Sequence, residues 1–174
     1  MLSFETTPDV YWQLVVKRTL DILVSGAALI ALSPFFLVLI LLVKLTSKGP
    51  VLFKQERCCL NGRRFQLYKF RTMVQDAEQR LEEIRKYNEM GGPVFKMTDD
   101  PRITPIGKWL RKFSLDEFPQ LINILKGDMS VVGPRPPVPS EVKQYALWQR
   151  RRLSMRPGLT CLWQVSGRNK ITSF

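Results

Sequence analysis

The chain has 174 residues, enough for one domain with a modest core and a membrane element, with a formal net charge of +12 and no histidine. The absence of histidine excludes a serine-type triad and most zinc sites, so catalysis would have to use carboxylates, lysine, arginine or cysteine. The excess of Lys and Arg indicates an anionic partner, which would be a membrane surface, a nucleic acid or a phosphorylated substrate.

The first strong feature is an uncharged apolar stretch of about 22 residues, from Ile22 to Val43. A helix of that length can span a bilayer. Lys17 and Arg18 precede the stretch, and Lys44 and Lys48 follow it. Because basic flanks prefer the cytoplasmic side of a membrane, one straight span cannot place both flanks favourably.

The pair Ser33-Pro34 lies in the middle of this stretch. Proline removes a backbone donor and disfavours the helical conformation of the residue before it, so the pair predicts a break in the helix. A broken helix that enters and leaves by the same face would satisfy both basic flanks. The alternative is a proline-kinked single span with a basic domain on one side, and the residues by themselves leave both open.

The segment Tyr11–Asp21 places its apolar residues on roughly one helical face and leads directly into the apolar stretch. It is typical of an interfacial helix, with Tyr11 and Trp12 at the level of the lipid headgroups. Asp21 lies at the rim of the apolar stretch, where a charge facing lipid is costly. We therefore expect a basic partner for Asp21.

A β-hairpin and a helix are predicted next. Pro50–Gln55 is a short strand, Asn61-Gly62 is a strong turn signal, and Arg64–Phe70 is the returning strand. Thr72–Tyr87 carries apolar residues at helical spacing, which predicts a charged amphipathic helix.

The second half of the chain predicts short elements that complete a small, α-rich α/β unit tied closely to its membrane helix. No element is predicted in the Gly- and polar-rich tail after Pro157. In chain order we expect a helix over Pro105–Phe113 with Ile106, Trp109, Leu110 and Phe113 inward, a helix from Ser114 to Lys126-Gly127, a strand at Val131-Val132, and a last helix that is capped by Ser140 and carries Trp148 and Arg150–Arg152.

The adjacent carboxylates Asp116 and Glu117 stand at a predicted helix start, close to Arg111. The structural interpretation is strong, since Ser114 and Glu117 fit a capping box and acids suit the positive end of a helix. The functional interpretation is that a carboxylate at a helix start stays ionised. Beside Arg111 it could then act as a nucleophile or as a Mg²⁺ ligand.

Two basic clusters accompany the carboxylates. Alternation along Leu67–Thr72 puts Lys69 and Arg71 on one face of a strand, although a half-solvated strand would show the same pattern. In Gly133–Pro137 the prolines fix the backbone around Arg135, as a phosphate clamp requires, or simply make a stiff turn. The cysteines Cys58, Cys59 and Cys161 fit neither a disulfide framework nor a metal site, and we expect them to be structural.

Taken in order, these motifs resemble the bacterial sugar transferases known as monotopic phosphoglycosyl transferases, over about residues 11–172. The resemblance is carried by many specific motifs in one order, which makes coincidence improbable. They are Lys17–Asp21, Ser33-Pro34, Gly49–Gln55, Tyr68–Arg71, Asp100–Thr104, Ser114–Glu117, Gly133–Pro136, Arg156–Thr160 and Gln164–Arg168.

The resemblance implies a fold that is α/β and mostly helical. Its expected parts are an N-terminal interfacial helix, a Pro-broken re-entrant membrane helix (residues 1–48), and a small catalytic domain with a short β-hairpin (residues 49–174). The domain would lie on the cytoplasmic face of the bacterial inner membrane. The implied reaction transfers a phosphosugar from a UDP-sugar to a polyprenyl phosphate, releases UMP, and initiates polysaccharide or glycoconjugate assembly.

The resemblance also implies the site residues. Asp116 would be the nucleophile that forms a phosphosugar-aspartate intermediate in a ping-pong mechanism, with Mg²⁺ as cofactor and Asp116 as a metal ligand. Glu117 would be its dyad partner, as base, organiser or metal-sphere residue. The residues expected to contact substrate are Lys69, Arg71, Arg111, Arg135 and Arg168. The expected partners are the UDP-sugar, polyprenyl phosphate and an anionic phospholipid membrane, without nucleic acid, and a homo-oligomer is left open.

Two other classes of function compete with the enzyme. One is a non-catalytic, membrane-anchored basic module that binds anionic lipid or nucleic acid, although no recognised nucleic-acid motif is present. The other is an inactive scaffold of a polysaccharide assembly complex. Family members usually continue past the equivalent of Arg168 with a further helical, aromatic-rich stretch, whereas this chain stops at Phe174, so we also expect a C-terminally truncated chain or a short variant. The sequence identifies neither the sugar nor the polyprenyl length.

Overall fold

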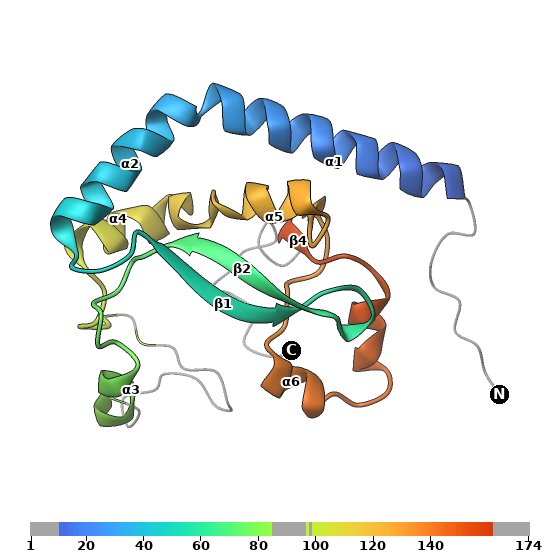
Figure 1. Ribbon diagram of the computed structural model, residues 1–174. Helices are drawn as coiled ribbons and strands as arrows, with labels where there is room; N and C mark the ends of the chain where they lie inside the picture. The colour runs from blue at the N-terminus through green and yellow to red at the C-terminus, as the bar shows by residue number, and fades with distance from the viewer. Residues whose placement is uncertain (1–10, 85–96, 98, 162–174) are drawn as a thin grey trace.

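A computed structural model describes residues 11–84, 97 and 99–161. Its N-terminal part is an arch of two helices, α1 (Tyr11–Ala31) and α2 (Ser33–Thr46), which are bent by 65° relative to one another (Figure 1). The Ser33 hydroxyl donates a 2.8 Å hydrogen bond to the carbonyl of Ile30, and Pro34 stands in the first turn of α2. The predicted break at Ser33-Pro34 is confirmed.

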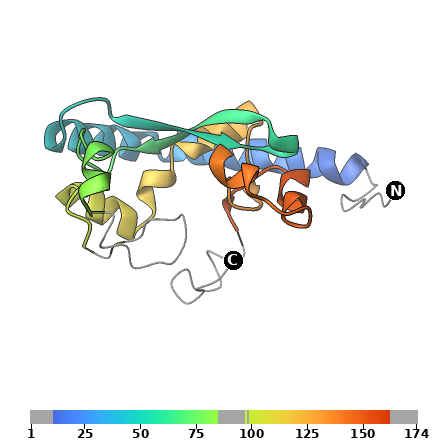
Figure 2. The ribbon, with the colours of Figure 1, turned by 90° about the horizontal axis from the view of Figure 1, so that it is seen from below.

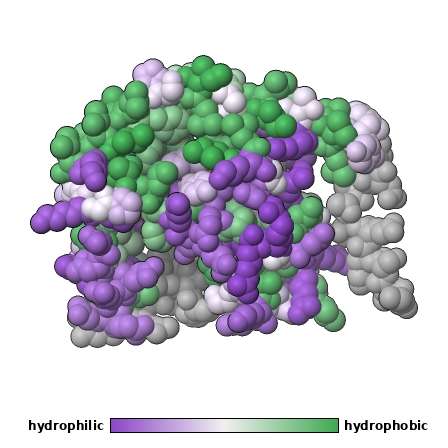
Figure 3. Space-filling view, in the orientation of Figure 1, coloured by the Kyte–Doolittle hydropathy of each residue, from purple (hydrophilic) through white to green (hydrophobic). Residues whose placement is uncertain are grey.

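The arch turns one side of its helices toward the rest of the protein. Asp21 and Ser25 are buried, and Ala28 and Leu29 continue this inward face at helical spacing. Most large apolar side chains of α1 and α2 are exposed on the other side, and Figure 3 shows them gathered along the arch. Among the described residues, α1 and α2 reach the length and apolarity of a membrane span only together, as a bent pair.

The predicted hairpin is present. Strands β1 (Leu52–Cys58) and β2 (Arg64–Phe70) pair antiparallel, with Leu52 opposite Phe70 and Cys58 opposite Arg64. The connection contains the short 3₁₀ turn η1 (Leu60–Gly62), in which Asn61 and Gly62 have φ values of 56° and 76°. Asn and Gly are the residues that adopt positive φ most readily, so the turn forms where the sequence predicts it.

The helix predicted over Thr72–Tyr87 is mostly wrong within the described residues. The observed helix α3 covers only Gln79–Ile84. The preceding residues run beside the segment 102–104: the amide of Thr104 donates to the carbonyl of Thr72, and the amide of Val74 donates to the carbonyl of Arg102. This pairing uses backbone groups that a helix would need.

Helix α4 (Pro105–Lys112) begins where predicted, because the Thr104 hydroxyl accepts a 3.0 Å hydrogen bond from the amide of Gly107. Leu110 is fully buried, but Trp109 and Phe113 are 43% and 53% exposed. Their rings pack against each other with centroids 5.3 Å apart. The prediction that Trp109 and Phe113 point inward is therefore wrong.

The predicted capping box at Ser114 is also wrong. Ser114 has a left-handed conformation with φ 57° and makes no side-chain cap bond. It leads into the single 3₁₀ turn η3 (Leu115–Glu117), and α5 (Gln120–Lys126) begins only after Pro119. Helix α5 ends at Gly127 as predicted, with φ 86°.

The last described part contains the predicted strand β3 (Ser130–Val132), which pairs in parallel with a strand that the sequence did not predict, β4 (Gly158–Thr160). The single helix predicted after Ser140 is two separate elements, α6 (Pro139–Lys143) and the 3₁₀ segment η4 (Gln149–Ser154). Ser140 lies inside α6 and is not its cap. The amide of Val138, at the start of α6, instead donates to the Glu141 carboxylate.

Two buried clusters hold the arch on the rest of the fold. One contains Leu67 and Ile124, with Ala28 and Leu29 of α1 packed against it. The other contains Leu39 and Val43 of α2 together with Phe70 and Leu110. Seen from below, the β1–β2 hairpin lies along one side of the arch, and α4 and the α6–η4 region lie along the other (Figure 2). The boundary between a membrane element (residues 1–48) and a catalytic domain (residues 49–174) remains a prediction.

Candidate active site

One face of the hairpin, the segment after it and the turn η3 line an open cavity of about 840 Å³. Five of the residues predicted from the sequence line it, namely Lys69, Arg71, Arg111, Asp116 and Glu117. The fold thus gathers cations and carboxylates that are far apart in the chain.

Asp116 is the more buried of the two adjacent carboxylates, with 8% of the residue exposed. Burial raises the pKa of Asp116 most strongly; nearby Lys69 lowers it, Glu117 raises it and Arg111 lowers it. We predicted that a helix start would keep this carboxylate ionised. The raised pKa runs against the stabilising effect expected of a helix start, because η3 is a single 3₁₀ turn whose small dipole does not offset the loss of solvation, and the ionised state of Asp116 remains a prediction.

Glu117 faces Lys69 from the neighbouring turn. The Nζ atom of Lys69 donates to Oε1 of Glu117 at 3.1 Å, and both side chains are mostly covered. This ion pair ties the end of β2 to η3. It also explains why Glu117 is not a helix-cap residue, since its carboxylate is directed to the hairpin.

Arg111 reaches the cavity from α4. Its Nε donates a 2.9 Å hydrogen bond to Oγ1 of Thr72. Burial lowers the pKa of Arg111, and the nearby Asp116 carboxylate raises it. The close approach behind this contact depends on Gly107, where an added Cβ would lie 2.1 Å from the carbonyl oxygen of Thr72.

A smaller cavity of about 120 Å³ adjoins the same ion pair, since Lys69 and Glu117 line it as well. Arg135 lines this smaller cavity. It therefore lies close to Lys69 and Glu117, which also line the larger one. Arg57 and Cys161 also line the smaller cavity. Three cations and one carboxylate around so small a space favour an anionic group.

The loop Gly133–Pro137 is held in place by three hydrogen bonds to its carbonyls. Pro134 accepts from the amide of Gly158 at 2.9 Å, Pro136 from Nη1 of Arg57 at 3.0 Å, and Pro137 from the amide of Cys58 at 2.9 Å. The stiff presentation of Arg135 predicted from the prolines is consistent with these contacts.

The sequence interpretation missed Arg57. Burial lowers its pKa first, and the neighbouring Arg135 lowers it further. Arg57 shares the face of β1 that includes Phe53 and Gln55, so the alternation that identified Lys69 on β2 could have identified it on β1.

Asn123 was also missed. It is fully buried in α5, where Oδ1 accepts from the amide of Tyr68 at 3.0 Å and Nδ2 donates to the carbonyl of Gln66 at 2.8 Å. This amide fixes β2, and hence Lys69, against α5. A single Asn in a short helix carries no distinctive pattern in the sequence.

Arg71 and Arg168 complete the list of predicted substrate contacts. Arg71 lines the larger cavity, but its Nη1 also donates to the carbonyl of Lys48 at 2.8 Å, near the end of the arch. Arg168 lies outside the described residues. Each predicted catalytic or substrate-contacting residue within the described part of the chain therefore lines at least one of the two adjoining cavities.

The carboxylates do not form a closed metal cage. Within the described residues, no group of three or more His, Cys, Asp or Glu side chains gathers to hold a metal ion. Mg²⁺ commonly binds through one or two carboxylates and substrate phosphates, and Asp116 fits that sparser donor set, whereas the Glu117 carboxylate is paired with Lys69.

Comparisons with known proteins are informative. The family model "Bacterial sugar transferase" matches residues 12–174. "Galactosyl transferase CpsE" of Streptococcus agalactiae serotype III (strain NEM316) is 52% identical over 166 residues, which cover 94% of this chain and 36% of that protein. "Exopolysaccharide production protein ExoY" of Sinorhizobium fredii (strain NBRC 101917 / NGR234) is 46% identical over 162 residues, which cover 91% of this chain and 72% of that protein.

A third relative is the "UDP-glucose:undecaprenyl-phosphate glucose-1-phosphate transferase" of Klebsiella pneumoniae, 42% identical over 158 residues that cover 88% of this chain and 31% of that protein. The chain spans about a third of this relative and of CpsE. Because the family model matches nearly the whole chain, the chain belongs to the bacterial sugar transferase family.

Proposed function

We propose that this chain transfers a phosphosugar from a UDP-sugar to a membrane polyprenyl phosphate and releases UMP, so initiating a polysaccharide or glycoconjugate. The observation that carries the proposal is the buried Asp116 at the wall of the 840 Å³ cavity, beside Lys69 and Arg111. Support comes from the name of the Klebsiella relative, which specifies transfer of glucose 1-phosphate from UDP-glucose to undecaprenyl phosphate.

The proposed chemistry has two displacements at one phosphorus atom. The ionised Asp116 carboxylate attacks the sugar-linked phosphorus of the donor, and the bond to the UMP oxygen breaks. A phosphate oxygen of the polyprenyl phosphate then attacks the same phosphorus, and the bond to Asp116 breaks, which restores the carboxylate. Each step depends on positioning and on cations that reduce the repulsion between the anionic partners.

Each cation of the site has its own proposed contact with the substrates. Lys69 and Arg111 flank Asp116 and would contact the reacting phosphate, while Arg135 would hold an anionic group of the donor from the smaller cavity. Arg71 at the larger cavity and Arg168 would contribute further phosphate contacts. Glu117 would act as an organiser that holds Lys69 in place, in keeping with their 3.1 Å ion pair.

Mg²⁺ is part of the proposal. Asp116 would hold it together with phosphate oxygens of the donor, since the described carboxylates offer too few ligands to bind it without substrate. When bound, the ion would neutralise charge on the diphosphate.

We further propose that the arch is a re-entrant element, with both ends on the cytoplasmic face of the bacterial inner membrane. Its helices bend by 65° at Ser33-Pro34, and both pack by their inner faces on the same catalytic unit. Their outer faces are apolar, and basic side chains flank both ends. The acceptor would thus reach the site from the bilayer side.

The decisive experiment is the intact mass of the protein after incubation with Mg²⁺ and a panel of UDP-sugars, without acceptor lipid. A phosphosugar adduct that is absent in Asp116→Asn is the expected result, and it would also identify the donor. Full turnover in Asp116→Asn would refute the nucleophile assignment. For Arg135→Ala we expect weaker binding of the donor, measured as a higher donor KM. An unchanged donor KM would argue against a contact between Arg135 and the donor.

The membrane arrangement has its own test. In a chain whose three cysteines are replaced, Trp12→Cys and Leu60→Cys should both react with a membrane-impermeant maleimide from the cytoplasmic side only. Labelling of the two positions from opposite sides would establish a single span and overturn the re-entrant arrangement.

A further inference from the structure

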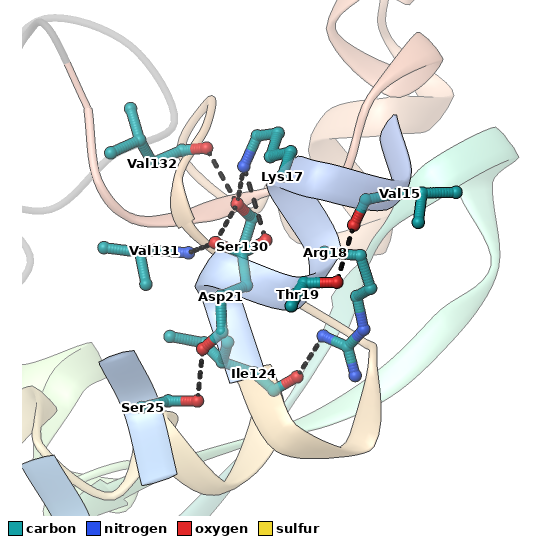
Figure 4. Close-up of polar contacts among 10 residues, drawn as sticks. All are labelled: Val15, Lys17, Arg18, Thr19, Asp21, Ser25, Ile124, Ser130, Val131 and Val132. Carbon is teal, nitrogen blue, oxygen red and sulfur yellow. Dashed lines mark hydrogen bonds and ion pairs between the residues drawn. The ribbon is translucent and has the colours of Figure 1, made fainter. Parts of the chain in front are cut away.

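Helix α1 has a polar inner face that reaches into the catalytic unit, at the end of the arch nearest the N-terminus. Arg18, Asp21 and Ser25 lie on this face, close to the end of α5 and to β3 (Figure 4). Asp21 is 5% exposed and Ser25 is fully buried. A polar cluster at the edge of an otherwise apolar helix is costly unless it has specific partners.

Asp21 has such partners on three sides. Its Oδ1 accepts a 3.0 Å hydrogen bond from the Ser130 hydroxyl and a 2.9 Å bond from the amide of Val131. Its Oδ2 lies 3.3 Å from Nζ of Lys17, which also contacts the Ser130 hydroxyl. The predicted basic partner of Asp21 is therefore confirmed as Lys17, and the carboxylate additionally holds the first residues of β3.

Arg18 makes a second attachment. Its Nη1 donates to the carbonyl of Ile124 at 2.6 Å and its Nη2 to the carbonyl of Leu125 at 2.9 Å. These carbonyls belong to the last turn of α5, where helical carbonyls lack the amide four residues on and a cation is favoured; the Ile124 carbonyl also accepts from the amide of Gly127 at 3.0 Å. A planar guanidinium can serve two such carbonyls together.

The two attachments lead directly to the site. Helix α5 follows η3, which carries Asp116, with only Phe118 and Pro119 between them. Strand β3 leads into the loop Gly133–Pro137, which carries Arg135. Short, packed elements transmit a displacement because protein interiors are close-packed. Movement of α1 would therefore displace both the nucleophile and the donor-binding arginine.

We propose that Lys17, Arg18 and Asp21 form a positioning latch, through which the seating of α1 sets the relative placement of Asp116 and Arg135. The latch would make the site competent only when the membrane helix is docked on the catalytic unit. This inference rests on the proposed function for its catalytic consequence, whereas its structural part stands independently.

The first test is hydrogen–deuterium exchange on the full chain in lipid nanodiscs. In Asp21→Ala, exchange should rise in peptides that cover residues 128–137 and remain unchanged over residues 52–56 of the hairpin, whereas the amide of Cys58 donates to Pro137 and should follow the loop. Asp21→Asn keeps an oxygen that can accept from Ser130 and Val131, so it should largely restore protection. Lys44→Ala, which removes a basic residue from the other end of the arch, is the matched control and should change neither region.

The second test is the steady-state kinetics of the same variants with the donor identified by the adduct experiment. Asp21→Ala should raise the donor KM by about 10-fold to 100-fold, as expected when a binding group is misplaced, and Asp21→Asn should recover most of the loss. Combination with Arg135→Ala should add little further effect, because both changes remove the same contact. Lys44→Ala and Arg135→Ala should combine independently.

The outcomes separate the latch from the reaction. Unchanged exchange over residues 128–137 in Asp21→Ala overturns the latch, and so does a uniform rise that includes residues 52–56 in both Asp21 variants. Local loosening with an unaltered donor KM overturns the positioning role. Absence of adduct and turnover in the unchanged chain overturns the proposed function, and the exchange pattern then decides alone whether Asp21 holds β3.

Discussion

Lys69 Nζ lies 3.1 Å from Glu117 Oε1, and these two side chains line both the larger and the smaller cavity. The pair therefore stands between Asp116 and Arg135, which reach the site from different parts of the chain. An ion pair in this position can orient the Lys69 ammonium toward a substrate, because an ammonium has three N–H donors and one carboxylate need not occupy all of them.

Lys69→Ala should lower the rate of adduct formation by about 10²- to 10³-fold, the usual loss when one preorganised donor to a developing charge is removed. Lys54→Ala is the matched control, because Lys54 lies on the opposite face of the same hairpin, over the ring of Tyr68. Intact-mass kinetics measure both. An equal loss in the two variants would mean that hairpin charge, and not the position of Lys69, supports the reaction.

The rate of adduct formation should fall on acidification with a midpoint above the ordinary aspartate pKa of about 3.9. Burial raises the pKa of Asp116, and only its ionised form can attack phosphorus. Initial rates at donor concentrations well below KM, between pH 4 and 8, report the midpoint for the protein without bound donor. A rate that stays level down to pH 4 would contradict a nucleophile with a raised pKa.

Asp116→Asn should be more stable than the unchanged protein at pH 7. The raised pKa means that the folded state holds the proton more tightly than the unfolded chain, so the associated stability is present below the unfolded pKa and is lost as pH rises through the folded pKa. At neutral pH the ionised carboxylate therefore costs stability, and an amide avoids that cost. The difference in Tm should shrink as pH falls toward 4. Asp99→Asn, at an exposed position, should show no comparable gain.

Asn123→Ala should destabilise the fold by about 1–3 kcal/mol, because it leaves the amide of Tyr68 and the carbonyl of Gln66 unpaired in a buried place. Thermal unfolding should show a loss of about 2–4 °C for each kcal/mol in a protein of this size. Gln66→Ala should be nearly neutral, since Gln66 contributes only its backbone carbonyl to this contact. A large loss in the Gln66 variant would show that another contact stabilises this part of β2.

Gly107→Ala should destabilise the protein by at least about 1–3 kcal/mol, the usual cost of overpacking, and should lower activity. The new methyl group would meet the Thr72 carbonyl at 2.1 Å and displace the residue that orients Arg111. Gly26→Ala is the control, because a methyl group added at this position of α1 would meet no neighbouring element within 4 Å. Stability and adduct formation should both be retained in that variant.

The sequence by itself determined the features that depend on local chemistry. Pro34 cannot continue the hydrogen bonding of a helix, so the break in the arch is fixed locally. Asn61 and Gly62 accept positive φ, so the hairpin turn is fixed locally as well. The same holds for the Gly127 end of α5. The family resemblance likewise predicts Asp116, Lys69, Arg111 and Arg135 as site residues from the sequence, and the structure places them at the two cavities.

Only the tertiary structure decided what depends on partners far away in the chain. The segment after Thr72 has helical spacing, yet pairing with residues 102–104 keeps much of it out of a helix. Glu117 fits a capping box, yet Lys69 of the hairpin takes its carboxylate. The raised pKa of Asp116 follows from burial by elements that converge on η3, and the attachment of α1 through Asp21 follows from contacts with β3. Local propensities amount to fractions of a kcal/mol per residue, whereas buried polar and charged groups impose larger costs unless they are paired, so long-range contacts decide these places.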